Sequence, residues 1–373
     1  MTENSDLDGL RSELDALDAQ LFEAVAARGR IVEAIGRIKR DSGQAVFDRH
    51  RERVVVERHL LHGQAAGLTS EESLMISRAI LASSHRLQAE KVATATSTRR
   101  FLLVGGRGGM GQMLARELED RGHSVDLLDQ GESDRLALAV AASDVVMLCV
   151  PMAVAVEVAS EVAPMMRPDA LLCDINSLKL EICETMGRRA PCEVLGLHPM
   201  FGPTVGSMLR QKVVVCEVKG GPLGAWLRDE FGRMGAELVE SDPMTHDKMM
   251  AVVQVLVHFN TLVTGEALRL FGANIEESLQ FTSPIYRLEL AFIGRLFAQS
   301  PELYAEILMR NPMGERVRSD FLAAAEEVNA VVHRGDREAF VALFDQAAES
   351  FSQFSTEAMR ISDDLIERLV SQA

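Results

Sequence analysis

Apolar residues follow a heptad pattern through residues 6–40. The residues of this repeat are Leu7, Leu10, Leu14, Leu17, Leu21, Ala24, Ile31, Ile35 and Ile38. Because no proline interrupts the segment, the pattern predicts one helix of about 34 residues, roughly 50 Å long. A helix of this length cannot bury its apolar stripe within its own short domain. We therefore expect it to pack against a partner, most simply a second copy of the chain.

Beyond residue 100 the apolar residues form short runs instead. Runs typical of strands cover residues 101–104, 124–129, 144–150, 170–175, 193–197 and 212–216, and helical segments separate the first of them. This alternation predicts a Rossmann-like, doubly wound parallel sheet. From Pro243 onward the strand patterns vanish, and amphipathic helices run to the end of the sequence.

One helix of this last region is unusually apolar. Its sequence, residues 249–263, is interrupted by Gln254, His258 and Asn260. The run is too short for a membrane span and is typical of a buried helix. We therefore expect no membrane association.

These changes of pattern predict three domains. Residues 91–100, KVATATSTRR, are small and polar and are typical of a junction. We expect an all-α domain over residues 1–93, a Rossmann-like α/β dinucleotide-binding domain over residues 99–243, and an all-α domain over residues 244–373. The last domain is expected to form a second dimer contact and to bind substrate against the sheet.

The composition limits the partners of the chain. The 373 residues carry a net charge of -16, which argues against nucleic acid or an anionic membrane as the main partner. The five cysteines show no metal-binding spacing and are typical of reduced thiols, so no metal site is predicted. The first residues, MTENSDLDGL, lack the pattern of a secretion signal, and we expect a cytoplasmic protein.

Arg28 stands where the heptad pattern calls for an apolar residue. A guanidinium on a buried seam is costly unless it is paired with an anion. Lys39 lies about 20° around the helix from Arg28 and shares its face. Arg11 lies about 25 Å from Arg28 along the axis, so it can join the same pocket only from another chain whose helix runs antiparallel.

Two further predicted helices carry complementary polar groups. Asp48, Arg51 and Glu52 share one helix face, and Ser84 and Gln88 share a face of the next helix. The set contains cations, carboxylates and an amide but no histidine or cysteine, which predicts a binding site for a small dicarboxylate. Any one of these charges alone is better explained by a solvated salt pair, and only the set together favours a binding site. The arginine on the seam has no such explanation.

Over residues 6–93 this set resembles the helical chorismate mutase family, whose members are intertwined all-α dimers. The resemblance implies rearrangement of chorismate to prephenate. No proton is transferred in this reaction, so such an enzyme fixes the folded conformer and stabilises charge on the breaking ether oxygen.

The same resemblance implies a role for each polar residue. Arg11 of the partner chain, Arg28 and Arg51 would hold the two carboxylates of the substrate. Lys39 and Gln88 would donate hydrogen bonds to the ether oxygen. Glu52 would accept a hydrogen bond from the ring hydroxyl, and Asp48 and Ser84 would make secondary contacts.

A glycine-rich turn follows the first predicted strand of the second domain. Gly106, Gly108 and Gly111 form a G-x-G-x-x-G pattern, which allows a tight turn and places a pyrophosphate at a helix N-terminus next to Met110. Asp129, at the end of the second strand, can accept hydrogen bonds from ribose hydroxyls and would repel a 2'-phosphate, which favours NAD over NADP. An acidic residue that merely ends a strand is the alternative. The positive charge of Arg107 within the turn has no explanation at this level.

Four later segments carry candidate substrate-binding residues. DINSLK (174–179) contains Ser177, LGLHPMFGP (195–203) presents His198 in a turn between two prolines, and HFNT contains His258. SPIYRLELAFIGRLFAQ (283–299) begins with a Ser-Pro helix start and holds two arginines in an apolar helix. An arginine buried there would need an anionic partner.

These segments resemble prephenate dehydrogenase, and their order after a mutase domain resembles the bifunctional chorismate mutase/prephenate dehydrogenases of tyrosine biosynthesis. The resemblance implies that NAD oxidises prephenate with loss of CO2, giving 4-hydroxyphenylpyruvate. A neutral histidine is suited to accept the hydroxyl proton near pH 7. The resemblance implies that His198 is the base and that Arg295 binds the side-chain carboxylate. It implies that His258 orients the substrate or the nicotinamide. Ser177 would tune the base, and Arg287 and Gln299 would be supporting residues.

Two alternatives remain open from the sequence. A related enzyme of the same fold would use arogenate, which has an amine where prephenate has a keto group. The second alternative is a regulatory protein that senses a nucleotide without catalysis. Such a protein would have no use for a residue that donates a hydrogen bond to an ether oxygen. The family also implies feedback inhibition by tyrosine, at a site that the sequence does not locate.

Overall fold

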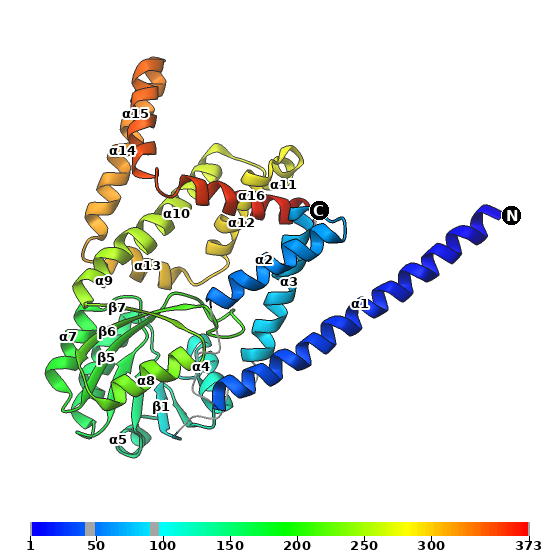
Figure 1. Cartoon of the computed structure of the whole chain (residues 1–373). Helices are drawn as coiled ribbons and strands as arrows, with labels where there is room; N and C mark the ends of the chain where they lie inside the picture. The colour runs from blue at the N-terminus through cyan, green and yellow to red at the C-terminus, as the bar shows by residue number, and fades with distance from the viewer. Residues whose placement is uncertain (1, 42–48, 90–96, 372–373) are drawn as a thin grey trace. The chain divides into compact units, whose positions relative to one another are not determined.

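We describe the chain from a computed structural model over residues 2–41, 49–89 and 97–371. The chain divides into two compact units. The first comprises Met1–Val150, Glu157–Ile175 and Cys183–Glu240, and the second comprises Pro151–Val156, Asn176–Ile182 and Ser241–Ala373. Figure 1 gives the order of the elements, and each unit is described by itself.

Three helices form the N-terminal part of the first unit: α1 (Thr2–Asp41), α2 (Arg49–Ala65) and α3 (Ser70–Ala89). The prediction of one long N-terminal helix is confirmed. Both α1 and α2 pack against α3, and the N-terminal half of α1 extends beyond them (Figure 1). The stripe residues Leu10, Leu14, Leu17 and Leu21 are about 60% exposed, as expected for a helix whose apolar face belongs against another chain.

Seven strands form the sheet of the first unit. They are β1 (Arg100–Val104), β2 (Ser124–Leu128), β3 (Val145–Leu148), β4 (Leu171–Asp174), β5 (Glu193–Pro199), β6 (Lys212–Lys219) and β7 (Glu237–Ser241). Their order is β2-β1-β3-β4-β5-β6-β7, and β2 through β5 pair in parallel. The core contains Phe101, Leu103, Met147, Leu171 and Leu195, all fully buried between the sheet and its helices.

The predicted sheet is wrong in two details. Strand β6 runs antiparallel to β5, because the connection over residues 200–211 contains no crossover helix, which a parallel neighbour would require. Strand β7 was not predicted, since its sequence, ELVES, carries two glutamates and lies at the partly exposed edge of the sheet.

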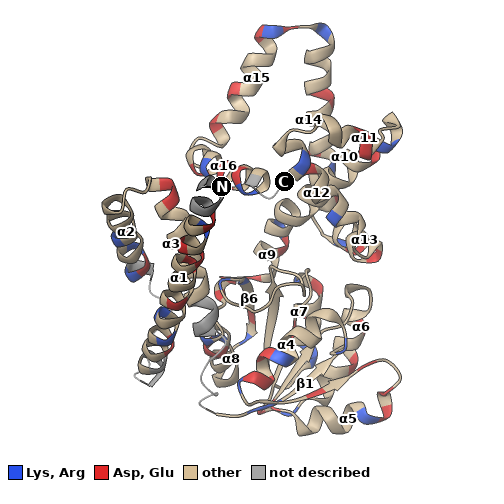
Figure 2. Cartoon of the chain, turned by 90° about the vertical axis from the view of Figure 1, so that its right-hand side faces the viewer, with Lys and Arg blue, Asp and Glu red and all other residues tan. Residues whose placement is uncertain are grey.

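The helices around the sheet are α4 (Gly109–Asp120), α5 (Ser133–Ala142), α6 (Met152–Val162), α7 (Leu180–Arg189) and α8 (Pro222–Arg233), with a short 3-10 turn at Ala163–Met165. Acidic and basic positions are interspersed along the described residues (Figure 2), as expected from the excess of acidic residues.

The second unit is helical after residue 242, as predicted. Its elements are α9 (Pro243–Met250), a π-helical segment (Ala251–Leu256), α10 (Val257–Phe271), α11 (Ile275–Ser278), a 3-10 turn (Leu279–Phe281), α12 (Pro284–Phe297), α13 (Pro301–Arg310), α14 (Gly314–Arg334), α15 (Arg337–Ser350) and α16 (Ser355–Ser371). Asp242, Ser283, Ser300 and Asp336 cap four of these helices by accepting a hydrogen bond from a backbone N–H. Helices α14 and α15 form a hairpin (Figures 1 and 2).

The apolar helix around residue 255 was predicted to be buried and too short to span a membrane, and both points need correction. Val252, Val253 and Val257 are about half exposed. Because the π segment continues the helix, Pro243–Phe271 is one stretch of 29 residues, long and apolar enough to cross a bilayer by length and composition alone. One such helix is weak evidence for a membrane span. Apolar surface of this kind also marks contacts between subunits.

A buried ionic cluster stabilises the first unit away from the carboxyl ends of the strands. The carboxylate of Glu230, which is 1% exposed, accepts hydrogen bonds from Arg121 and from Nε2 of His123. Nδ1 of His123 accepts a hydrogen bond from the backbone N–H of Arg99 at 3.2 Å, so the proton of the neutral ring lies on Nε2. Burial raises the pKa of Glu230, but the bonds from His123 and Arg121 outweigh it and bring the pKa to about 2.

Glu230→Gln should lower the free energy of unfolding of this unit by about 3 kcal/mol, because it leaves the buried Arg121 without its counter-charge. Since the pKa of the carboxyl is depressed, its contribution is complete above the ordinary value of 4.5 and is lost as the pH falls toward 2. Denaturant titrations from pH 3 to 7 would measure this. The exposed Glu119→Gln on α4 is the control, and an equal effect of both changes would contradict the interpretation.

Candidate active sites

The helical region brings together two of the predicted mutase residues. Arg28 of α1 donates a hydrogen bond from Nη1 to Oγ of Ser84 on α3. Ser84 is buried and donates its own proton to the carbonyl of Ile80 at 2.7 Å, so its oxygen is free to accept from the guanidinium. The arginine is partly buried, which lowers its pKa from 12.5, yet it remains a cation at neutral pH.

A histidine that the sequence did not single out lies near this pair. His59 on α2 is half-buried, and its Nδ1 lies 2.7 Å from Oγ of the buried Ser77. Burial lowers the pKa of His59, and the charges of Arg28 and His62 lower it further. The imidazole therefore adds little positive charge beside Arg28 at neutral pH.

The remaining mutase residues do not join this pair within the described chain. Arg11 is exposed and forms an ion pair with its neighbour Asp8 at 3.3 Å. Arg51 is exposed at the start of α2, and Glu52 accepts hydrogen bonds of 2.8 and 2.6 Å from Arg210. Three further candidates lie outside what the structure describes: Asp48 altogether, and the side chains of Lys39 and Gln88.

The glycine-rich turn has the predicted context of strand, turn and helix. It follows β1 between β2 and β3, where the strand order reverses and doubly wound sheets bind ligands. A Cβ at Gly106 would lie 2.7 Å from the carbonyl oxygen of Leu103, and a Cβ at Gly111 would lie 2.5 Å from that of Gly106. No other residue fits at these two positions without a backbone shift. Gly108 precedes α4, and Met110 lies in its first turn, where free N–H groups can bind a phosphate.

The acidic residue after β2 is bound to this turn. Oδ2 of Asp129 accepts a hydrogen bond of 2.9 Å from the backbone N–H of Arg107. The guanidinium of Arg107 lies 3.5 Å from the same oxygen and also binds Glu132. The hydrogen bond from Arg107 is the main reason that the pKa of Glu132 falls to about 2. The positive charge that the sequence left unexplained is thus balanced by two carboxylates.

Asp129→Asn should weaken NAD binding and reduce the preference for NAD over NADP by at least about 10-fold, because the negative charge that would repel a 2'-phosphate is gone. The amide oxygen can still accept the bond from Arg107. Calorimetric titration with each nucleotide would measure the ratio. Asp126→Asn, which removes an exposed carboxylate of the same strand, should leave it unchanged. An unaltered ratio in the Asp129 variant would exclude this role.

His198 lies in the first unit, on strand β5 and not in the predicted turn. The strand continues through Pro199, and His198 pairs with Val214 of β6. Its side chain is 3% exposed. The prolines at positions 199 and 203 suggested a turn, but Pro199 is the last residue of the strand.

The other dehydrogenase candidates lie in the second unit. Ser177 is half-exposed in the turn between β4 and α7, and His258 lies in the first turn of α10. The ring of His258 is 5.0 Å from that of Tyr304 on α13, edge to face. Burial lowers the pKa of His258, so its imidazole is neutral near pH 7. The contact between Tyr304 and His258 was not predicted, because no sequence pattern links the two residues.

The sequence suggested that an arginine of α12 is buried with an anionic partner, and the described chain shows no such burial. Arg287 and Arg295 are both exposed, and α12 buries Ile293 and Leu296 instead. Arg295 acts electrostatically on Tyr304: burial raises the pKa of this phenol and the arginine's charge opposes the rise. Gln299 is exposed and donates a hydrogen bond of 3.1 Å to the carbonyl of Arg295.

A buried polar cluster in the second unit was not predicted. It contains Lys179, His246, Asp247 and Asn311, all at most 5% exposed. The available signal was the His-Asp pair immediately before the apolar helix, since a charged residue there needs a partner.

Comparison with known proteins assigns the regions of the chain. Residues 10–89 match the family described as chorismate mutase type II. Residues 111–219 match the nucleotide-binding domain of prephenate dehydrogenase, and residues 242–346 match its dimerization domain. The fold and these regions define a helical mutase followed by a nucleotide-dependent dehydrogenase.

Curated relatives cover almost the whole chain. It is 31% identical to the T-protein of Haemophilus influenzae over 364 residues, 97% of each protein, and 29% identical to the T-protein of Enterobacter agglomerans over 364 residues, again 97% of each. The chain belongs to the T-protein family. The bifunctional organisation predicted from the sequence is confirmed.

A solved structure agrees in fold. The prephenate dehydrogenase from A. aeolicus, in complex with hydroxyphenyl propionate and NAD+, superposes with a TM-score of 0.55 over 70% of this chain and 99% of that chain. The sequence identity is 16%, so this likeness concerns the fold alone.

Proposed function

We propose that this chain catalyses two consecutive steps of tyrosine biosynthesis. It rearranges chorismate to prephenate, and it then oxidises prephenate with NAD to 4-hydroxyphenylpyruvate, CO2 and NADH. The observation that carries this proposal is the similarity to T-proteins over 97% of both chains. The contact between Arg28 and Ser84 and the glycine turn at the reversal of strand order support it.

The mutase step needs charge and shape but no proton transfer. Arg28, Arg51 and a partner's Arg11 bind the two carboxylates. Lys39 and Gln88 donate to the ether oxygen, where negative charge develops. Glu52 accepts from the ring hydroxyl, and Asp48 and Ser84 hold the surrounding polar groups. The exposed stripe of α1 supports the dimer that this site requires.

In the dehydrogenase step NAD supplies the acceptor for the hydride that leaves the carbinol carbon. Gly106, Gly108, Met110 and Gly111 would hold its pyrophosphate, and Asp129 would bind the ribose. A ring nitrogen of His198 accepts the proton of the hydroxyl, since a neutral imidazole has one nitrogen with a lone pair that can act as the base. The ring carboxylate then leaves as CO2, and the ring becomes aromatic.

The substrate is held by the second unit. Arg295 binds the side-chain carboxylate, and its exposure in the described chain leaves the guanidinium accessible to an anion. Neutral His258 orients the substrate, and Ser177 tunes the base. Arg287 and Gln299 support this arrangement.

We retain three domains in this proposal, over residues 1–93, 99–243 and 244–373. The chain acts as a homodimer in the cytoplasm, and the match to a dimerization domain and the half-exposed valines of residues 252–257 support the dimer. Feedback inhibition by tyrosine belongs to the same proposal.

The absorbance of NADH at 340 nm tests the function directly. Purified protein with NAD should give a signal with prephenate and, through both steps, with chorismate. A signal with arogenate alone would show that arogenate, and not prephenate, is the substrate. No change in absorbance with any of the three substrates, with either NAD or NADP, would favour a regulatory protein without catalysis.

Arg28→Ala should reduce mutase kcat/KM by on the order of 100-fold or more, because it removes a charge-assisted contact to the substrate. Oxidation of supplied prephenate should stay within about 2-fold of wild type. Disappearance of chorismate and NADH formation would be followed in parallel. Arg30→Ala, an exposed arginine of the same helix, is the control. Equal loss of both activities would argue against two separate sites.

His198→Asn should reduce dehydrogenase kcat by about 100-fold to 10,000-fold, as expected for loss of a general base. The Kd for NAD should not change, because the nucleotide contacts lie elsewhere. Steady-state rates and NAD titration would measure both quantities. The exposed His333→Asn at the end of α14 should leave both at the wild-type value. An undiminished kcat in the His198 variant would exclude it as the base.

A further inference from the structure

One residue in the second unit, Asp247, joins three separate segments of the chain through its carboxylate and its backbone carbonyl. Asp247 of α9 is 1% exposed. Its Oδ1 accepts a hydrogen bond of 2.8 Å from the backbone N–H of Lys179, and its Oδ2 accepts one of 2.9 Å from the backbone N–H of Leu180. Nδ1 of the adjacent His246 lies 2.7 Å from Oδ1 and donates to it.

The third segment is the connection between α13 and α14. Nδ2 of Asn311 donates a hydrogen bond of 2.9 Å to the carbonyl oxygen of Asp247, and Oδ1 of Asn311 accepts one of 2.9 Å from the backbone N–H of Met313. Both side chains are buried, so their hydrogen bonds are not replaced by water when one partner is removed. We refer to His246, Asp247 and Asn311 with the backbone N–H groups of residues 179 and 180 as the Asp247 network.

Two segments of the Asp247 network carry a residue that the proposed function places near the substrate, and the third carries a residue that contacts one of these two. Ser177 is two residues before Lys179, in the turn whose N–H groups the carboxylate binds. His258 follows Asp247 in the continuous helical stretch of residues 243–271. Tyr304, which contacts His258, lies on α13, the helix that ends next to Asn311.

The π segment between α9 and α10 makes the direction of His258 depend on this anchor. A π turn holds one residue more than an α turn, so the residues after it are rotated by about 100° around the axis. The segment is fixed on one side by the buried Ala251 and Val255 and begins three residues after Lys248. The position of α9 therefore determines the direction in which the side chains of α10 point.

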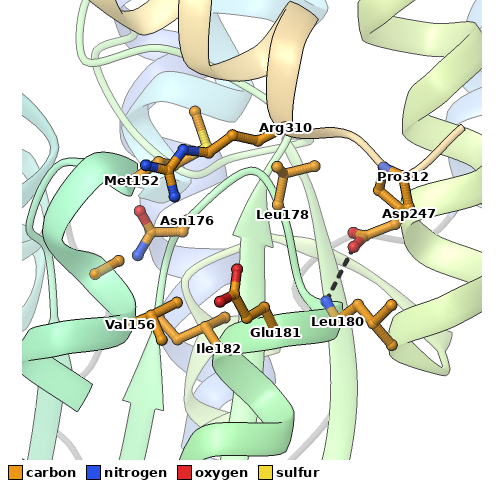
Figure 3. A pocket seen from close by; sticks show the side chains of 11 residues that line it. Met152, Val156, Asn176, Leu178, Leu180, Glu181, Ile182, Asp247, Arg310 and Pro312 are labelled. Atoms are coloured by element: carbon orange, nitrogen blue, oxygen red, sulfur yellow. Dashed lines mark hydrogen bonds between the residues drawn. The ribbon is translucent and has the colours of Figure 1, made fainter. Parts of the chain in front are cut away.

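A cavity lies next to the Asp247 network and borders the Ser177 turn. It has a volume of about 190 Å³ and is lined by Asn176 and Leu178 of the turn, by Asp247, and by Arg310 and Pro312 at the end of α13. Figure 3 shows these side chains around the space, with the bond from Leu180 to Asp247 at its edge. Packing is incomplete on the cavity side of the turn, whereas Leu178 packs against the core of the second unit, so the bonds to the carboxylate act together with this packing.

We propose that Asp247 is a positioning residue of the dehydrogenase: its carboxylate fixes the Ser177 turn relative to the helix that carries His258, so that both side chains meet the substrate in one geometry. This proposal rests on the proposed function of Ser177 and His258. It assigns to Asp247 no contact with substrate and no proton transfer. Its effect on the reaction passes through the backbone of residues 177–180.

Asp247→Asn tests the positioning role, because the amide presents N–H groups where two backbone donors need acceptors. We expect kcat/KM for prephenate to fall about 10-fold to 100-fold. The Kd for NAD and the mutase kcat/KM should stay within about 2-fold. The pH profile should keep the limb of the wild-type base at lower amplitude. Loss of a limb would instead make Asp247 an acid or base and overturn the proposal.

A pair of variants at His246 tests the positioning role if Asp247→Asn does not fold. His246→Asn keeps a donor close to the position of Nδ1 and should retain most of the activity, whereas His246→Ala should lose about 10-fold in kcat/KM for prephenate. Equal activity of these two variants would overturn the proposal.

The matched control is Glu230→Gln, another buried carboxylate with a histidine partner but in the first unit. It should lower stability with unchanged kinetic constants at 20 °C. If Asp247→Asn likewise affects stability alone, the positioning role is excluded. Failure of the wild-type protein to oxidise prephenate would overturn the proposed function and with it the positioning role, whereas failure of the positioning role alone leaves the wild-type activity intact.

Discussion

The register of the parallel strands is the constraint on which the nucleotide site depends. Strand β1 pairs with β2 on one side and β3 on the other, and Val104 is level with both Leu128 and Leu148. Leu148 is in turn level with Asp174 of β4. Four strands therefore end at one edge of the sheet. The glycine turn and Asp129 are brought together by this register, and the bond from Arg107 to Asp129 closes the contact between them.

Buried carboxylates have two different functions in this chain. Glu230 is bound to Arg121 and His123. The positive charge of Arg121 balances its negative charge, and this ion pair stabilises the first unit. Asp247 is bound mainly to backbone N–H groups, which carry no net charge but have fixed directions. A carboxylate of the first kind contributes to stability, whereas one of the second kind determines where a turn lies. The difference follows from the partners and not from the degree of burial, since both carboxylates are 1% exposed.

Two of the regions with uncovered apolar surface in the described chain bear on its assembly. The stripe of α1 and the valines around residue 253 are both exposed in the single chain. The two regions match a mutase family and a dimerization domain, respectively. Water contact with so much apolar surface is unfavourable, and a second copy of the chain would remove it. In the helical region such a copy would also supply the Arg11 that one straight helix holds about 25 Å from Arg28.

The sequence by itself determined the long N-terminal helix, the first strands, the glycine turn and the family, because each depends on residues close together along the chain. It also singled out Arg28, since one charged residue broke a regular repeat. Only the tertiary structure decided that β6 runs antiparallel, that His198 lies on a strand, that the arginines of α12 are exposed, and that Asp247 binds a turn almost seventy positions earlier in the chain. These features arise from contacts between distant segments, and no local pattern of apolar and polar residues encodes the partner of a buried group.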